Sequence, residues 1–183
     1  FGQFIHQEER YILKEWFKES DYYKFYAGII NSSVLRGAIK EKGYELHFIP
    51  HPVFFPYINE FDFGSNVVIH GNDVSYNQMF CESSLFITDY SYAVFDCAYL
   101  MKPVIYTQFD TEEFYKSQYE RGMFDYDMEG FGPVVESIEG AVEKIVGYIN
   151  NDCKMEEMYK KRALEYFKYR DKKNANRIFE ELF

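Results

Sequence analysis

Residues 84–106, SLFITDYSYAVFDCAYLMKPVIY, decide the fold because they read as a strand, a turn, a helix and a second strand in succession. The runs 85–89 (LFITD) and 103–108 (PVIYTQ) are rich in β-branched and aromatic side chains, as buried strands are. Between them, residues 91–101 carry apolar groups along one side at helical spacing. A strand, a helix and a strand at this spacing form a right-handed crossover, so the stretch predicts two parallel strands of one sheet.

The same pattern extends in both directions along the chain. Residues 45–51 (ELHFIPH) and 66–71 (NVVIHG) are two more predicted strands. Residues 109–137 loosen into a loop of about thirty residues, a length that is usually functional inside a compact domain. The predicted helices cover residues 7–18, 33–43, 75–83, 111–116, 138–149, 155–169 and 173–183. The sequence thus predicts an α/β fold with a Rossmann-like parallel sheet, helices on both faces and a helical C-terminus.

The composition is that of one globular domain. Hydrophobic residues make up 47% of the 183 positions and charged residues 27%, so we predict a single domain over residues 1–183. The chain starts at Phe1 rather than at a methionine, and we therefore expect it to be part of a longer protein. No apolar run approaches the roughly 20 residues of a membrane-spanning helix, and no signal peptide is recognisable, so we expect a cytoplasmic location. The cysteines have no CxxC spacing and are expected to be reduced thiols: Cys81, Cys97 and Cys153.

The charge pattern argues against nucleic acid as a partner. The formal net charge is −10, whereas binding to a phosphate backbone needs clustered Lys and Arg. One dense basic patch, KKRALEYFKYRDKK at 160–173, has two interpretations. It is either a solvated helix face with ion pairs four residues apart or a surface for an anionic membrane leaflet.

Polar side chains stand where the strand at 85–89 meets the following helix. Ligands of open α/β sheets lie outside the carboxyl ends of the strands, so Thr88, Asp89 and Ser91 are candidate binding residues. If Ser91 caps the helix, the unpaired N–H groups of the first turn and the positive end of the helix dipole would hold a phosphate. Ser91 is equally a routine N-cap with no ligand. Asp96, further along the helix, either holds ribose hydroxyls or is a solvated helix residue.

His51 is a second candidate for a functional residue. In the segment FIPHP, Pro52 restricts His51 to an extended conformation at the end of a predicted strand. A histidine can take or give a proton near neutral pH, although a lone histidine is often structural. The four histidines and three cysteines lack metal-ligand spacing. A DYD triplet at 125–127 arises easily in a chain with 30 acidic residues, so we predict neither a metal nor another cofactor.

Three blocks of the sequence resemble one known family in their order and spacing. They are HFIPHP at 47–52, residues 76–114 (beginning YNQMFCESS), and YERGMFDYDMEGFGPVV at 119–135. Over residues 45–182 the chain is similar to the CDP-glycerol glycerophosphotransferases, the teichoic-acid primases and polymerases of bacterial cell envelopes, which are similar in fold to GT-B glycosyltransferases. The resemblance implies that the chain looks like the C-terminal, donor-nucleotide half of such an enzyme. It also implies that the family's N-terminal domain, with its acceptor surface and a second catalytic histidine, lies outside these residues.

The resemblance also implies roles for single residues. His51 matches the histidine of the family's HP motif and would be the catalytic base or a phosphate contact, and Asp96 matches the acid of FDF and would hold the ribose. The residues that match the phosphate-binding TDYSS turn and a later RG pair are Thr88, Asp89, Ser91, Arg121 and Gly122. Tyr92 departs from the family, which usually has a second serine there, and this removes one hydroxyl from the anion site.

The implied reaction transfers glycerol phosphate, or a related polyol phosphate, from a CDP-activated donor to a cell-envelope polymer or lipid-linked acceptor, with release of CMP. The implied partners are the CDP-polyol donor, this acceptor and the missing N-terminal domain, at the inner face of the cell membrane. The chain alone is expected to be inactive. Two rival interpretations stay open: the donor domain of a nucleotide-sugar glycosyltransferase, and a nucleotide-binding or interaction module without catalysis, which Tyr92 favours.

Overall fold

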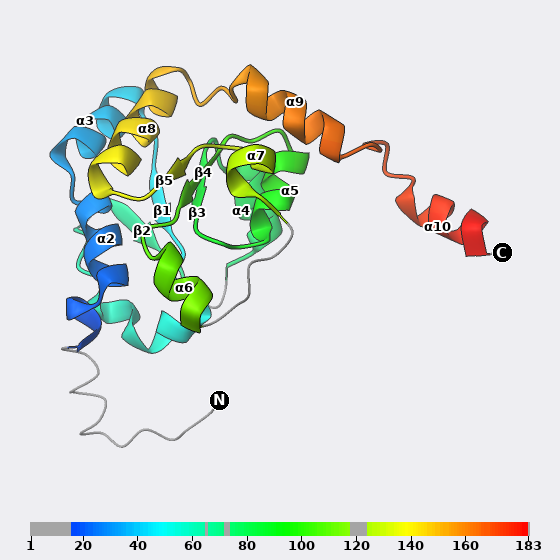
Figure 1. Cartoon of the computed structure of the whole chain (residues 1–183). Coiled ribbons are helices and arrows are strands. Elements are labelled where there is room, and N and C mark those ends of the chain that lie inside the picture. Colours follow the sequence, from blue (N-terminus) through cyan, green and yellow to red (C-terminus); the bar gives the residue numbers. More distant parts are fainter. Residues whose placement is uncertain (1–15, 65, 72–73, 118–123, 183) are drawn as a thin grey trace. The chain divides into compact units, whose positions relative to one another are not determined.

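The computed structural model describes residues 16–64, 66–71, 74–117 and 124–182. They form two compact units, of which the first runs to Tyr76 and also includes Ser137–Asn150. The second comprises Asn77–Glu136 and the residues from Asn151 onward (Figure 1). All strands of the described ranges pair in parallel, so the predicted α/β class is confirmed. The single domain over the whole chain stays a prediction.

The first unit combines short parallel strands with α-helices. Its elements are α2 (Asp21–Ile30), α3 (Ser33–Lys42), β1 (Leu46–Phe48), the 3-10 helix η1 (Pro52–Glu60), β2 (Val67–Ile69) and α8 (Ile138–Asn150). Leu46 of β1 lies opposite Val67 of β2. Helix α8 packs against both α2 and α3 (Figure 1). The buried core of this unit is largely aromatic and contains Phe17, Ile30, Phe48, Phe61 and Phe63.

Local signals explain where α2 and α3 begin and end. Ser20 caps α2 and Ser32 caps α3, because each serine oxygen accepts a hydrogen bond from the main-chain N–H three residues on. Gly43 ends α3 in the left-handed conformation (φ 71°), which glycine adopts without steric cost, so the predicted helix over residues 33–43 is confirmed. Helix α2 was not predicted from the sequence. The predicted helix over residues 7–18 lies mostly outside the described residues.

The second unit is built on a three-stranded parallel sheet with β4 in the centre. Its elements are α4 (Tyr76–Glu82), β3 (Phe86–Thr88), α5 (Ala93–Tyr99), β4 (Val104–Thr107), α6 (Thr111–Ser117), α7 (Tyr126–Glu129), β5 (Val134–Val135), α9 (Glu157–Tyr166) and α10 (Asn174–Leu182). Helix α5 packs against β3, β4 and α9. The core between them includes Val94, Cys97, Ala98, Val104, Tyr106 and Phe131.

Strand β5 lies inside the segment that we expected to be a long loop. Gly132 lets this segment approach β4 closely, because a Cβ at Gly132 would lie only 1.8 Å from the carbonyl oxygen of Val104. Helices α9 and α10 are confirmed but shorter than predicted, and α9 ends at Tyr166 rather than at residue 169. Within the described ranges, no helix combines the length and the apolar composition needed to cross a lipid bilayer.

Candidate functional site

The turn after β3 brings three of the predicted binding residues together at the carboxyl end of the sheet. Thr88, the last residue of β3, is 8% exposed, and its carbonyl oxygen accepts a hydrogen bond of 3.1 Å from Oγ1 of Thr107. This bond ties the end of β3 to the end of β4. Asp89 is half-buried and Ser91 is exposed, so the turn presents a carboxylate and a hydroxyl to the surface.

Tyr90 fixes this turn to the neighbouring strand. Its hydroxyl lies 3.0 Å from Oδ1 of Asp110 and 3.1 Å from Oγ1 of Thr111, at the start of α6. Its ring stacks on Phe114 of the same helix, with 3.7 Å between ring centroids. Tyr126 adds a bond of 3.5 Å from its hydroxyl to the carbonyl oxygen of Tyr90. The turn is therefore held from two sides.

Burial changes the acid–base behaviour of the cluster formed by Tyr90, Asp110, Thr111 and Tyr126. It raises the pKa of Tyr90 well above its usual value and raises the pKa of Tyr126 to about 12. Both tyrosines therefore keep their protons at neutral pH and can donate hydrogen bonds. Burial also raises the pKa of Asp110, while the hydrogen bond with Tyr90 lowers it. The cluster is thus a hydrogen-bonded support rather than a set of exposed acids.

Ser91 does not cap α5 in the way that the sequence suggested. The N-cap position is Tyr92, whose backbone is already helical (φ −66°, ψ −12°) and whose side chain makes no capping bond. The Ser91 hydroxyl instead accepts a hydrogen bond of 3.3 Å from the N–H of Ala93. Ser91 therefore pairs the first N–H group of α5 from the position that precedes the N-cap residue. Among the residues that the structure describes, none accepts a hydrogen bond from the Ser91 hydroxyl, so this hydroxyl can donate its proton to a ligand.

Asp96 lies in the first turn of α5 and is exposed. Its neighbour Cys97 is fully buried, and burial, together with the charge of Asp96, raises the pKa of that thiol to about 12. Tyr92 is 82% exposed. The exposed carboxylate and the exposed ring therefore both stand near the start of the helix that follows the turn.

His51 belongs to the first unit, where it forms the N-cap of η1. Its backbone is extended (ψ 140°), as Pro52 predicts. Its Nδ1 accepts a hydrogen bond of 3.3 Å from the N–H of Val53, and the ring is exposed. In the neutral ring the proton then sits on Nε2, which becomes a donor.

The remaining predicted positions divide into two groups. Arg121 and Gly122 lie outside the described residues. In the DYD triplet, Asp125 caps α7 by accepting hydrogen bonds from the N–H groups of Asp127 and Met128. Across the described ranges, no group of three His, Cys, Asp or Glu side chains is placed to hold a metal ion.

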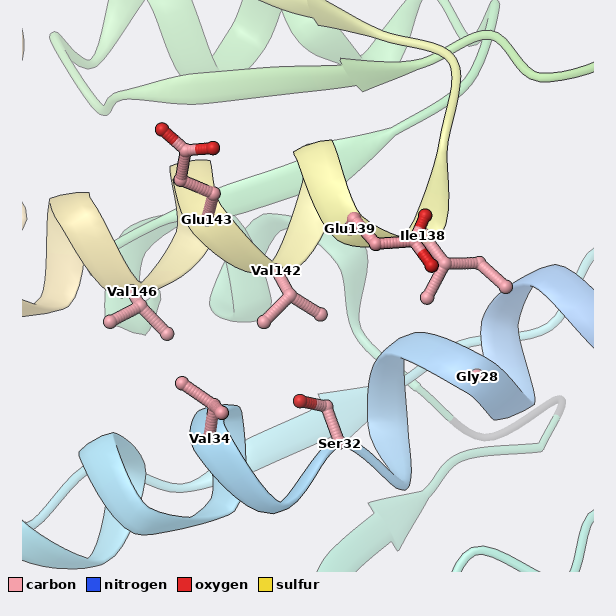
Figure 2. Close-up of a pocket in the computed structure, with 8 residues that line it drawn as sticks. All are labelled: Gly28, Ser32, Val34, Ile138, Glu139, Val142, Glu143 and Val146. Atoms are coloured by element: carbon pink, nitrogen blue, oxygen red, sulfur yellow. The ribbon is translucent and has the colours of Figure 1, made fainter.

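An open pocket of about 550 Å³ lies within the first unit, between α8 and the helices α2 and α3 (Figure 2). Figure 2 shows valines of α8 facing Val34 and Ser32 of the opposite side. The pocket contains none of the predicted site residues. Its lining is formed by Gly28, Ser32, Val34, Ile138, Glu139, Val142, Glu143 and Val146.

Sequence reasoning missed two groups of polar residues. Asp110 and Thr111 follow β4 at the same sheet edge as Thr88, and the rule that parallel strands end at one edge could have found them. His47 and His70 form the second group, with Nδ1 of His47 lying 2.9 Å from Nε2 of His70. Parallel pairing of β1 with β2 brings these two histidines together, and no local motif announces it.

Comparison with known proteins identifies relatives along most of the chain. A family model described as CDP-Glycerol:Poly(glycerophosphate) glycerophosphotransferase matches residues 15–183. The chain is 37% identical over 163 residues to the minor teichoic acid biosynthesis protein GgaB of Bacillus subtilis (strain 168). The aligned residues make up 89% of this chain and 18% of GgaB. It is 33% identical over 78 residues to the teichoic acid poly(glycerol phosphate) polymerase of the same organism, covering 43% of this chain and 10% of that protein. The chain thus spans less than a fifth of either relative.

Solved structures share the fold. The wall teichoic acid polymerase TagF superposes with a TM-score of 0.59 at 17% identity, over 82% of this chain and 37% of that chain. A TagF variant soaked with CDPG gives the same TM-score at 18% identity, over 84% of this chain and 37% of that one. The fold and the match over residues 15–183 agree: this chain belongs to the CDP-glycerol:poly(glycerophosphate) glycerophosphotransferase family.

Proposed function

We propose that this chain is the donor-nucleotide-binding part of a glycerophosphotransferase. The whole enzyme would transfer glycerol phosphate, or a related polyol phosphate, from a CDP-linked donor to a cell-envelope polymer or lipid-linked acceptor. The observation that carries the proposal is the family match over residues 15–183, which includes the polar turn at the carboxyl end of β3. Ligands of parallel sheets bind at this edge.

The reaction is a displacement at phosphorus. An acceptor hydroxyl oxygen attacks the β-phosphorus of the donor, the bond from that phosphorus to the bridging oxygen breaks, and CMP leaves with the oxygen. The proton of the attacking hydroxyl passes to a base. Such a transfer needs alignment of the attacking oxygen and positive potential over the phosphates.

Within this chain, the residues of the β3 turn and of α5 would bind the donor. Ser91 can donate its hydroxyl proton to a phosphate oxygen, because its oxygen already accepts the N–H of Ala93. Asp89 is an anion and would repel a phosphate, so we assign its contribution to the main-chain N–H. Asp96 is exposed and can accept the two ribose hydroxyls. From the RG match, Arg121 and Gly122 would contact the pyrophosphate, and Thr88 would hold the turn in place.

His51 would contact a donor phosphate. With Nδ1 accepting the N–H of Val53, the neutral ring carries its proton on Nε2. That group can donate a hydrogen bond to phosphate, whereas a general base must accept a proton. The hydrogen bond therefore favours a phosphate contact over the base that we also considered from the sequence.

Two further partners belong to the proposal. The acceptor and the N-terminal domain that would hold it lie outside this chain, as would the second wall of the site. We propose a cytoplasmic location at the inner face of the membrane for the whole enzyme. The basic patch at 160–173 gives limited support, because several of its cations have partners within the chain: Lys160 with Glu157, Lys161 with Glu165, Arg162 with Gly130 and Arg170 with Tyr99.

A nucleotide-binding module without catalysis is the second candidate. The exposed ring of Tyr92 favours it, since an aromatic ring at this place offers a stacking surface but no hydroxyl from a second serine. Transfer assays separate the two candidates. The whole protein, given CDP-glycerol and a polymer or lipid acceptor, should release CMP and extend the acceptor, while the 183-residue chain should bind the donor and release none. Donor binding by the whole protein without any transfer would establish the second candidate.

A further inference from the structure

Gln108 occupies the end of the central strand of the second unit. It follows Thr107, the last residue of β4, and only 6% of it is exposed. Its main chain is fully engaged: the N–H donates to the carbonyl oxygen of Val135 at 2.9 Å, and the carbonyl oxygen accepts from Oγ1 of Thr111 at 2.9 Å. The position of the residue is therefore fixed by strand pairing and by the start of α6.

The side chain of Gln108 is an exception to this complete pairing. Among the residues that the structure describes, its Nε2 is the one buried side-chain nitrogen or oxygen without a hydrogen-bond partner. A buried polar group without a partner destabilises the folded protein, and such groups are few in folded proteins. An apolar side chain of the same length would avoid this penalty. The amide therefore calls for an explanation outside the folding of the unit.

The location of Gln108 indicates a ligand as that explanation. Thr88, the last residue of β3, pairs with Tyr106, so Gln108 follows β4 at the same edge of the sheet where the turn with Tyr90 follows β3. Thr111 also links Gln108 to Tyr90. Its Oγ1 donates a hydrogen bond to the carbonyl oxygen of Gln108 and accepts one from the hydroxyl of Tyr90. The unpaired amide is thus at the same carboxyl edge as the proposed donor-binding turn.

We propose that Gln108 is a further donor-binding residue, whose amide nitrogen donates a hydrogen bond to an oxygen acceptor of the CDP-linked polyol. This inference rests on the proposed function. Phosphate, ribose, polyol and the cytosine carbonyl all supply such an oxygen, and an amide offers two N–H donors to it. The nitrogen is covered by its neighbours, so a ligand oxygen reaches it only after a neighbouring side chain has moved.

The substitution Gln108→Met tests the proposal because stability and affinity should change in opposite directions. Methionine has nearly the same shape and carries no N–H, so the Tm of the 183-residue chain without ligand should rise by about 2 to 4 °C. The Kd for CDP-glycerol, measured by calorimetry, should rise about tenfold or more. Gln78→Met is the matched control, since Gln78 is exposed on α4 and donates a hydrogen bond of 2.8 Å to Glu82 of the same helix. It should change neither quantity.

Smaller ligands locate the contacted oxygen. If Gln108→Met weakens binding of CMP, the oxygen belongs to the nucleoside monophosphate. If it weakens CDP or CDP-glycerol but not CMP, the oxygen belongs to the β-phosphate or the polyol. Gln108→Glu should weaken CDP-glycerol binding further than Gln108→Met does, because a carboxylate places an acceptor opposite an acceptor.

An unchanged Kd for CDP-glycerol in Gln108→Met would overturn the inference and leave the proposed function intact, provided that the unsubstituted chain binds this ligand. A fall in Tm with unchanged affinity would show that the amide is paired within the protein, which also overturns it. If the unsubstituted chain does not bind CDP-glycerol at all, the proposed function of the chain fails, and the role of Gln108 fails with it.

Discussion

Two strand ends in this chain carry candidate binding residues, and they are held in different ways. After β1, His51 is an exposed ring with a hydrogen bond from Val53 to its Nδ1. After β3, two hydrogen bonds fix the turn. Thr107 donates to the carbonyl oxygen of Thr88, and the hydroxyl of Tyr90 donates to Asp110, which follows β4. The ring of His51 is held by the hydrogen bond from Val53, whereas several contacts from the end of β4 and the start of α6 hold the β3 turn. Substitutions at His51 should therefore affect donor binding and the reaction with little loss of stability, whereas those that loosen the β3 turn should also lower the Tm.

The largest effect is expected at His51. In the whole enzyme, His51→Ala should lower turnover about 10²-fold or more, a loss in the range that general acid–base or phosphate-contacting groups contribute. Because we assign His51 to a phosphate contact, the Kd for CDP-glycerol should rise about tenfold as well. The Tm should fall only slightly, because the exposed ring contributes one hydrogen bond of 3.3 Å at the start of η1. Loss of turnover with unchanged donor affinity would instead identify a base, and a normal rate would remove His51 from the mechanism.

The next largest effect is expected at Ser91 and Asp96. Ser91→Ala and Asp96→Asn should each weaken CDP binding about tenfold, because a hydrogen bond involving a charged group contributes roughly 1.5 to 3 kcal/mol. The fall in Tm should be small, because the Ser91 oxygen satisfies one N–H at the start of a short helix. Ser84→Ala and Asp62→Asn, at exposed positions outside the turn, are the matched controls. Unchanged affinity in both test variants would return these residues to structural roles.

A smaller effect, and one on stability first, is expected at Tyr90. Tyr90→Phe removes the hydroxyl beside Asp110 and leaves a half-buried carboxyl without that bond, at a cost of about 1 to 3 kcal/mol. The Tm should fall by several degrees at pH 7. Tyr92→Phe, the same change on an exposed ring, should leave the Tm unchanged.

The fall in Tm caused by Tyr90→Phe should depend on pH. Burial raises the pKa of Asp110 and the Tyr90 bond opposes the rise, so the substitution should raise that pKa further. A carboxyl with a raised pKa destabilises the fold above that pKa and ceases to do so below the ordinary aspartate value of about 4. The fall in Tm caused by Tyr90→Phe should therefore be larger at pH 7 than at pH 4. An equal fall at both pH values would show that Asp110 does not depend on Tyr90.

The sequence predicted those parts of the fold that have strong local signals. The strands at β3 and β4 and the glycine that ends α3 follow from residue type and spacing. Strand β5 has two residues, too few for any periodicity, and it exists because Gly132 allows close approach to β4. Likewise, the sequence placed the N-cap of α5 at Ser91, whereas the backbone places it at Tyr92. Helix ends are commonly uncertain by one or two residues.

The candidate site was predictable where a motif lies in one stretch and not where strands bring distant residues together. Thr88, Asp89 and Ser91 are neighbours in the sequence and lie in one turn. The partnership of Tyr90 with Asp110 spans 20 residues and depends on the register of β3 with β4. The unpaired amide of Gln108 depends on burial, which residue type does not reveal for a glutamine.

Calorimetry of the 183-residue chain with CDP and with UDP tests whether the β3 turn belongs to a cytidine-nucleotide donor site. The two ligands share the ribose and the pyrophosphate and differ only in the base, so the comparison isolates the identity of the donor. We expect CDP to bind more tightly than UDP, and we expect Asp96→Asn to weaken the binding of both ligands to a similar extent. Equal or tighter binding of UDP would contradict this expectation and would favour the donor domain of a nucleotide-sugar glycosyltransferase.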